Sequence, residues 1–267
     1  MRQRRSFFLV TAALFGYAFL YIPLAIVVMF SFNNSKLVTV WTGFSTQWYG
    51  ALLANDRLIK SLWVSLEIAT LSATLAVILG TLAALALVRI GKFRGRLFFR
   101  GLLNVPFVLP DIITGLALLL LFVTLHKLIS WPVRGAITIT IAHTTLSMAY
   151  VTAIVQSRLK DYDYSLDEAA MDLGARPLKV FFLITLPTIA PALVSGWLLS
   201  FALSLDDVVI ASFVSGPEAT TLPMVIFSSI RLGVTPQINA LATLIILSVA
   251  LAITCATVIM NRQKRSA

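Results

Sequence analysis

Long apolar runs, separated by short charged segments, set the pattern of the whole sequence. The first run covers Phe7–Phe30 after a basic start, and further runs lie at about 63–88, 102–125, 136–157, 187–214 and 236–260. A helix of about 20 apolar residues crosses the hydrocarbon core of a bilayer. The pattern therefore predicts an all-α membrane protein with six transmembrane helices. The first run is longer than the core of a secretory signal, so we expect it to remain as an anchor.

Composition and charge support this class. Of the 267 residues, 59% are hydrophobic and 12% are charged, and the mean hydropathy is +0.94, whereas a soluble domain carries roughly 25% charged residues. The net charge of +10 is spread between the apolar runs. It therefore indicates membrane topology and a surrounding lipid bilayer, not a nucleic-acid partner. The single cysteine, Cys255, allows no intrachain disulfide and no Cys-rich metal site, and we expect no bound metal.

The distribution of Lys and Arg predicts the orientation. With the N-terminus inside, 15 of the 21 Lys and Arg residues lie in segments on the cytoplasmic side, as the positive-inside rule requires. Both termini and the segment 165–187 are then cytoplasmic. The first outside segment, 33–61, holds Trp41, Phe44, Trp48 and Tyr49. We interpret these aromatic residues as an interfacial belt, with a contact surface for an extracytoplasmic partner as the alternative.

The segment Ser165–Pro187, SLDEAAMDLGARPLKVFFLITLP, interrupts the apolar pattern. Ser165 and Glu168 have the spacing of a capping box at a helix start. Gly174 lies where a left-handed C-terminal cap is expected, and Pro177 where a second helix begins. We predict a helix of about two turns, a tight turn and a second helix. So short a helix is marginal in water by itself, which indicates a docking element.

Charged side chains within the predicted spans need a reason, because a carboxylate at the bilayer centre costs about 2.5–3.5 kcal/mol on insertion scales. Asp111 lies inside the third span, and Asp206 and Asp207 lie late in the fifth. We predict that these carboxylates line a pathway for a cation. Trp197 and Tyr150 offer aromatic faces for methylene or ammonium groups, with ordinary helix packing as the alternative for each.

The pattern of the segment 165–187 also resembles a known motif. Glu168-Ala169-Ala170, Gly174 after three residues, and Ile184 and Leu186-Pro187 beyond it resemble the EAA loop of ABC-importer permeases. Over most of its length the chain is similar to the inner-membrane permease subunits of bacterial polyamine ABC transporters, most of all the putrescine type. The stretches that carry this similarity are SFNNSKLVTVWTGFSTQWYG, LPDIITGLALLLLF, LSLDDVVIASFVSGPEATTLPM and INALATLII.

The resemblance implies a type I ABC importer permease fold in a bacterial inner membrane. Residues 1–62 would be an anchor helix and periplasmic loop, 63–260 the transmembrane core, and 261–267 a cytoplasmic tail. Glu168, Ala169, Ala170 and Gly174 would couple to the ATPase. The implied partners are a second homologous permease, a cytoplasmic ATPase dimer and a periplasmic polyamine-binding protein. ATP and Mg²⁺ would bind to the ATPase, and this chain would carry no cofactor.

The residues give no sign of an enzyme. Gly91-Lys92 lacks the remainder of a phosphate-binding loop, and His143 fits a polar contact between helices better than a metal ligand. An ion-coupled secondary transporter, using Asp111 and Asp207, is the alternative of another class. Such folds often have inverted repeats, and the sequence has no convincing repeat. A membrane scaffold would leave the mid-span carboxylates unexplained. A permease for spermidine, for another cation or for a different solute is the alternative within the class.

Overall fold

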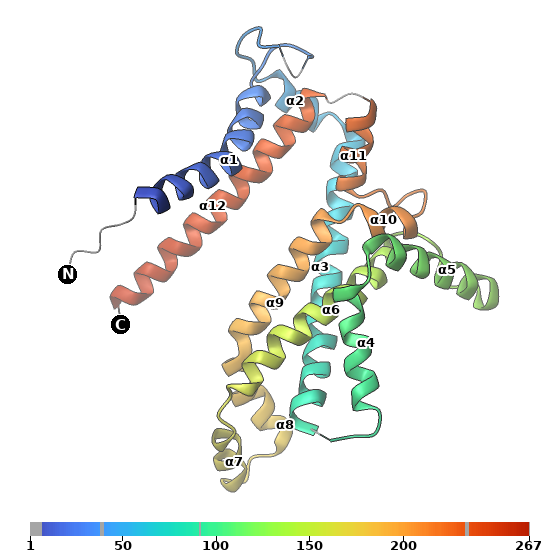
Figure 1. Ribbon diagram of the computed structural model, residues 1–267, viewed down its shortest axis with the longest axis vertical. Helices are drawn as coiled ribbons and strands as arrows, with labels where there is room; N and C mark the ends of the chain where they lie inside the picture. The colour runs from blue at the N-terminus through green and yellow to red at the C-terminus, as the bar shows by residue number, and fades with distance from the viewer. Residues whose placement is uncertain (1–6, 38–39, 91, 233–234, 267) are drawn as a thin grey trace. The chain divides into compact units, whose positions relative to one another are not determined.

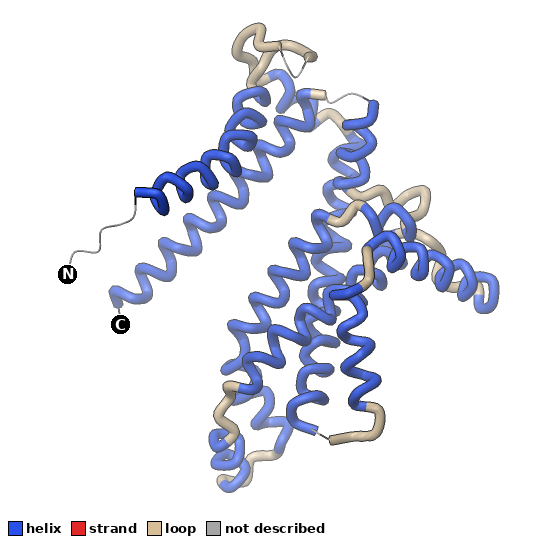
Figure 2. The backbone as a smooth tube through the Cα atoms, viewed as in Figure 1, coloured by secondary structure: helices blue, strands red, loops and turns tan. Residues whose placement is uncertain are grey.

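The computed structural model describes residues 7–37, 40–90, 92–232 and 235–266, and these residues form helices joined by loops (Figure 2). The only extended pairing among them is an isolated bridge between Asn33 and Phe44. The prediction of an all-α chain is therefore confirmed. The helices, in chain order, are α1 (Phe7–Ser31), α2 (Gln47–Leu53), α3 (Asp56–Leu85), η1 (Ala86–Ile90), α4 (Arg96–Val108), α5 (Asp111–Ile129), α6 (Ala136–Lys160), α7 (Ser165–Asp172), α8 (Pro177–Val180), η2 (Phe181–Thr185), α9 (Leu186–Asp206), α10 (Val209–Val214), α11 (Leu222–Leu232) and α12 (Pro236–Ser266), where η marks a π-helix.

The chain divides into two compact units. The first, the terminal unit, comprises residues 1–59 and 228–267, and the second, the central unit, comprises residues 60–227. In the terminal unit α12 packs along α1 and against α2, so that the first and last helices of the chain lie side by side (Figure 1). The last helix thus packs with the N-terminal segment in one unit.

Helix α6 is the core of the central unit. It packs against α9, α4, α10 and η1 (Figure 1). Ile139, Val151 and Val155 on α6 are fully buried, and Ala76 and Ala84 on α3 are buried in the same clusters or beside them. Small side chains let helices approach closely, which is how membrane helices gain packing energy without a hydrophobic driving force between them.

Gly80 lies where α3 packs tightly against α6. A Cβ atom at residue 80 would lie 2.8 Å from the Val151 Cβ atom and 3.0 Å from the Met148 carbonyl oxygen. We expect Gly80→Ala to lower the free energy of unfolding by about 1–3 kcal/mol, because the added methyl group overpacks this contact. Thermal unfolding of the detergent-purified chain measures the effect.

Gly101→Ala is the matched control for this prediction, since an added methyl group on α4 meets nothing within 4 Å. This substitution should be neutral or slightly stabilising, because alanine favours helices over glycine. Equal stability of the two variants would contradict the close packing of α3 on α6.

Two of the predicted spans were wrong as single helices. The run 102–125 is divided between α4 and α5, because Leu109 and Pro110 are extended, with ψ angles of 135° and 142°. Pro110 has no N–H group to continue the helix and disfavours helical geometry at Leu109. The run 187–214 is divided at Asp207, whose ψ of 123° ends α9. The carboxylates predicted inside two spans therefore lie at helix breaks.

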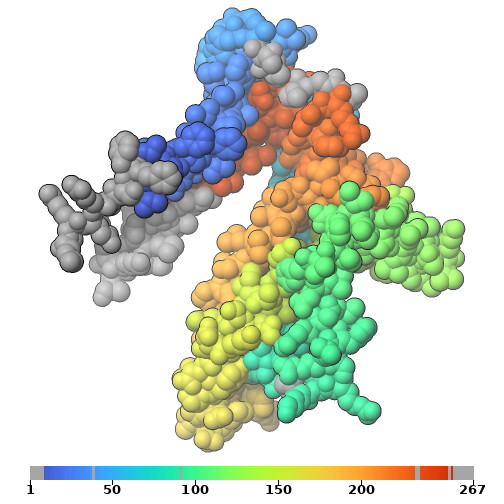
Figure 3. All heavy atoms as spheres, in the orientation of Figure 1, coloured from blue at the N-terminus to red at the C-terminus, as the bar shows by residue number. Residues whose placement is uncertain are grey.

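Five helical segments among the described residues are long and apolar enough to cross a membrane. They are Leu9–Ser31, Asp56–Ile90, Asp111–Ile129, Ala136–Lys160 and Pro177–Asp206. The sixth predicted span lies on α12, of which Pro236–Leu251 forms a shorter apolar segment. Much of α5 is exposed, and it projects from the other helices of the central unit (Figure 3). A helix left uncovered by its own chain requires lipid or another subunit around it.

Candidate functional site

The two helix breaks meet at a cavity in the central unit. The cavity has a volume of about 440 Å³, and Asp111, Asp206 and Asp207 all line it. Asp111 is the first residue of α5, and Asp206 and Asp207 follow each other at the end of α9. His143 and Tyr150 line the same cavity from α6. The structure thus brings together carboxylates that lie almost 100 residues apart in the sequence.

Asp207 is held by the protein on several sides. Its Oδ1 accepts a hydrogen bond from the Ile210 N–H group (3.2 Å), and its Oδ2 accepts one from the Ala211 N–H group (2.7 Å). The Oδ2 atom also lies 3.1 Å from His143 Nε2. The carboxylate therefore caps the first turn of α10 and ties it to α6. A side-chain acceptor at a helix start satisfies N–H groups that have no partner within the helix.

The opposite ring nitrogen of His143 continues this connection. His143 Nδ1 lies 2.6 Å from Ser204 Oγ on α9, and the Ser72 hydroxyl group on α3 donates to Ser204 Oγ over 3.3 Å. The prediction that His143 makes a polar contact between helices is confirmed. Among the described residues, no group of three or more His, Cys, Asp or Glu side chains is arranged to hold a metal ion.

Asp207→Asn should therefore destabilise the protein. We expect a loss of about 1–2 kcal/mol in the free energy of unfolding, because asparagine keeps one acceptor oxygen and loses the charge that faces His143 and the α10 N-terminus. The measurement is thermal unfolding in detergent. Asp206→Asn is the matched control one residue away and should change stability little; the reverse order of the two effects would count against this assignment.

Asp111 and Asp206 differ from Asp207 in their surroundings. Both are exposed to the cavity. Asp167 pairs with Arg89, and Asp207 faces His143, whereas among the described residues neither Asp111 nor Asp206 forms an ion pair with a cationic side chain. Two uncompensated carboxylates at one cavity create a negative potential that favours a positively charged ligand.

The two predicted aromatic residues lie in different places. Tyr150 lines the cavity with the carboxylates and packs edge to face on Phe107, with 4.7 Å between the ring centroids. Trp197 does not line this cavity. Its Nε1–H group donates to Thr74 Oγ1 on α3 (3.1 Å), and its ring stacks on Phe201 at 5.1 Å. Tyr150 is thus placed to contact a ligand of the cavity, whereas Trp197 joins two helices.

The segment 165–187 folds as a helix, a tight turn and a second helix. Gly174 follows α7 with a φ angle of +85°. Its N–H group donates to the Met171 carbonyl oxygen (2.9 Å), and the Ala175 N–H group donates to that of Ala170 (3.1 Å). These two bonds form a Schellman motif, and α8 begins at Pro177. The predicted glycine cap and proline start are confirmed.

The predicted capping box at Ser165 was wrong. Tyr164 is the N-cap residue of α7, and no side chain caps the helix from that position. Ser165 is already helical, and its N–H group donates to Asp163 Oδ1 over 3.0 Å. The hydrogen bonds from Ser165 hold the pKa of the exposed Asp163 carboxyl below its usual value. The acceptor for the helix start therefore comes from two residues earlier than predicted.

The outer face of α7 is exposed and mixes apolar with polar and charged side chains. Glu168 and Ala169 are exposed, and Ala170 is half-buried. Close to them Leu166 is 49% exposed and Leu173 is 90% exposed. Large apolar side chains that stand out next to small ones suit contact with another protein. The coupling role of Glu168, Ala169, Ala170 and Gly174 stays a prediction that this exposure supports.

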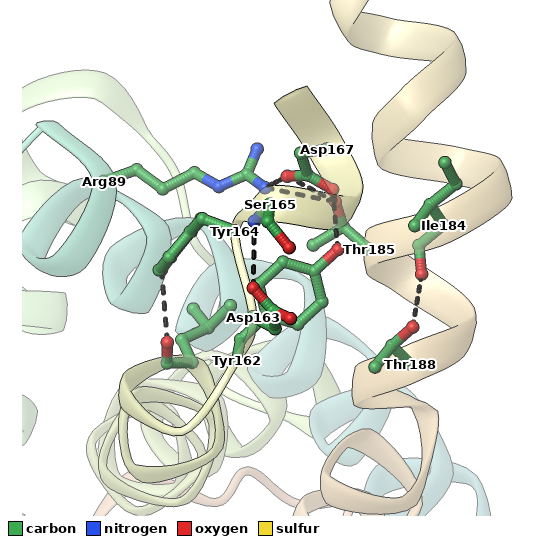
Figure 4. A network of polar contacts seen from close by, with 10 residues as sticks. Arg89, Tyr162, Asp163, Tyr164, Ser165, Asp167, Ile184, Thr185 and Thr188 are labelled. Atoms are coloured by element: carbon green, nitrogen blue, oxygen red, sulfur yellow. Dashed lines mark hydrogen bonds and ion pairs between the residues drawn. The ribbon is translucent and has the colours of Figure 1, made fainter. Parts of the chain in front are cut away.

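The inner face of α7 carries a buried carboxylate that the sequence analysis missed (Figure 4). Asp167 forms an ion pair with Arg89 of η1. Its Oδ1 accepts hydrogen bonds from the Tyr162 hydroxyl group (2.6 Å) and from Thr185 Oγ1 of η2 (3.1 Å). Arg89 also donates to Thr185 Oγ1 (3.1 Å) and lies over the Tyr164 ring at 5.6 Å. Burial, together with the bond to Asp167, raises the pKa of Tyr162.

The chain is a helical membrane protein whose broken helices surround a carboxylate-lined cavity. A short exposed helix is fastened to the long helices. This arrangement is that of a transport permease. The family described as binding-protein-dependent transport system inner membrane component matches residues 76–267. The chain belongs to this family and is an inner-membrane protein. The family and location implied by the EAA loop are confirmed.

Relatives and solved structures agree with this membership. The chain is 56% identical over 262 residues to the putrescine transport system permease protein PotI of Escherichia coli K12, covering 98% of this chain and 93% of PotI. It is 46% identical over 249 residues to the spermidine/putrescine transport system permease protein PotC of Haemophilus influenzae, covering 92% and 95%. A bacterial ABC transporter involved in the import of alginate has the same fold, with a TM-score of 0.73 at 18% identity over 98% of both chains.

Proposed function

We propose that this chain is a permease subunit of an ABC importer that moves a polyamine, foremost putrescine, into the cytoplasm. The cavity with Asp111 and Asp206 is the observation that carries the proposal, because its uncompensated carboxylates suit the ammonium groups of a diamine. Tyr150 adds an aromatic face on which an ammonium or methylene group can rest. The similarity to PotI along almost the whole chain supports the same substrate class.

The arrangement in the membrane has six spans, with α12 as the sixth, and both termini in the cytoplasm. The excess of Lys and Arg in the segments assigned to the cytoplasm supports this orientation. It places α7 and Gly174 on the side where ATP is available. A second, homologous permease subunit would cover the exposed helices of this chain and complete the pathway, with residues 63–260 as the transmembrane core.

Energy for transport reaches this chain mechanically. A cytoplasmic ATPase dimer binds and hydrolyses ATP with Mg²⁺, and the outer face of α7, including Glu168 and Ala169, docks into it. Movement of α7 passes to α6 and α9, which flank it in the chain. The pathway then alternates between outward and inward access, an equilibrium that the partner biases through its own conformation. A periplasmic polyamine-binding protein delivers the substrate.

The test is labelled putrescine uptake by vesicles that contain this chain, its partner permease, the ATPase and the binding protein. We expect uptake only with ATP on the cytoplasmic side. ATP-dependent uptake of a different solute, without putrescine uptake, would support the permease function and contradict a polyamine as the substrate. Uptake driven by a proton gradient without ATP would instead establish an ion-coupled transporter.

Spermidine is the second candidate substrate, because PotC, named for both spermidine and putrescine, is 46% identical to this chain. Competition by unlabelled spermidine in the same vesicles separates the two. Unlabelled spermidine is tested with a putrescine-binding protein and, separately, with a spermidine-binding protein. If it lowers putrescine uptake in both cases, the permease itself accepts both polyamines.

A further inference from the structure

The buried Asp167 carboxylate joins three separate parts of the central unit to α7. Its side chain is only 6% exposed, and that of its partner Arg89 is 32% exposed. Arg89 lies in η1, directly after α3, and Thr185 is the last residue of η2, directly before α9. Tyr162 follows the end of α6. One carboxylate thus contacts residues next to the ends of α3, α6 and α9 (Figure 4).

We propose that Asp167 is a positioning residue that fastens α7 to the ends of α3, α6 and α9, so that a displacement of α7 moves these three helices together. This rests on the proposed function, in which the ATPase displaces α7. The chain alone connects α7 only to α6 and, through α8 and η2, to α9. The ion pair adds α3 through Arg89, which lies 78 residues from Asp167 in the sequence.

The outer and inner faces of α7 have different roles in this proposal. The outer face, with Leu166 and Glu168, is exposed and available to the ATPase. Asp167 lies between these two residues in the sequence and is 4% exposed. Successive residues of a helix point about 100° apart, which is why Asp167 faces inward while its neighbours face outward. Substitution of Asp167 should therefore leave ATPase docking intact and weaken the transfer of motion.

Burial makes the effects of the two charged partners unequal. Loss of Arg89 leaves a carboxylate that water barely reaches, and removal of one partner of a buried pair is more harmful than removal of both. Loss of the Asp167 charge leaves a guanidinium group that is partly open to solvent. We expect Arg89→Gln to lower the free energy of unfolding more than Asp167→Asn does. The double variant should be no less stable than Asp167→Asn alone.

The experiment measures substrate transported per ATP hydrolysed by the complete reconstituted complex. We expect Asp167→Asn to lower this ratio by about tenfold, with normal co-purification of the ATPase and near-normal ATP hydrolysis. Asp161→Asn is the matched control, since Asp161 is an exposed carboxylate just after α6. A merely structural role would lower assembly and hydrolysis together and would leave the ratio unchanged.

Tyr162→Phe provides a second variant if Asp167→Asn complexes assemble poorly. It removes one donor to the carboxylate and keeps the ring, and we expect a two- to threefold fall in the ratio, about the effect of one weakened hydrogen bond. An unchanged ratio in both variants, in complexes whose wild type transports, would overturn the role of Asp167. Absence of ATP-dependent uptake in the wild-type complex would instead contradict the proposed function.

Discussion

Gly174→Val should lower ATP-dependent uptake by the reconstituted complex by tenfold or more. Gly174 has a φ angle of +85°, and this left-handed conformation costs an L-residue about 1–2 kcal/mol, and more for a β-branched side chain. Relief of the strain would break the two hydrogen bonds that close α7 and would redirect the chain toward α8. In the proposed function, α7 would then present a different surface to the ATPase.

The measurement is putrescine uptake together with ATP hydrolysis stimulated by the binding protein, and both should fall. Gly174→Asn is the conservative variant and should retain most of the activity, because asparagine tolerates the left-handed conformation. Gly95→Val tests strain alone, since Gly95 has nearly the same φ angle, +86°, in the turn before α4. Equal losses in the Gly95 and Gly174 variants would show that general destabilisation, not docking, explains the result.

Neutralising the cavity carboxylates should reduce transport without loss of stability. We expect Asp111→Asn and Asp206→Asn each to lower the maximal uptake rate by about 10- to 100-fold, since a hydrogen bond to a charged group contributes about 1.5–3 kcal/mol. The amide retains the size of the side chain and removes the charge that a cation would meet. Neither carboxylate has a cationic partner within the described part of this chain.

Initial uptake rates at saturating binding protein and ATP measure this effect, and thermal unfolding of the same preparations shows whether the variants are folded. Asp111→Glu and Asp206→Glu keep the charge and should retain more transport than the amides. Asp207→Asn should differ from both by losing stability. Full uptake in the Asp111→Asn and Asp206→Asn variants would contradict the proposal that the cavity is the path of a cation.

Local sequence rules predicted the turn after α7 correctly but not the N-terminus of α7. A glycine after a short helix and a proline three residues later predicted the Schellman motif and the start of α8, because both depend on backbone geometry at single residues. The start of α7 had two candidate acceptors, Asp163 and Ser165. The sequence pattern favoured Ser165, whereas the bend that leads out of α6 puts the Asp163 carboxylate at the open N–H group.

The cavity and the buried network depend on contacts that one sequence does not reveal. Pro110 could have announced the break before Asp111, but the break at Asp207 has no proline or glycine, and it depends on bonds to His143 and the α10 backbone. Asp167 and Glu168 are adjacent acidic residues of a short helix, and nothing in the sequence pattern marks Asp167 as the buried one. Only the fold shows that Arg89 and Thr185 converge on Asp167.

The two faces of α7 also bear on how a permease of this kind could come to work with a different ATPase. In the proposed function, the exposed residues that would touch the ATPase, such as Leu166, are separate from those that hold α7 in the permease. Exchange of the outward side chains can then redirect the permease to a foreign ATPase without rebuilding its interior. The same separation lets the two proteins drift apart over evolution by compensating changes at one exposed surface, while the Asp167 side of the helix stays as it is.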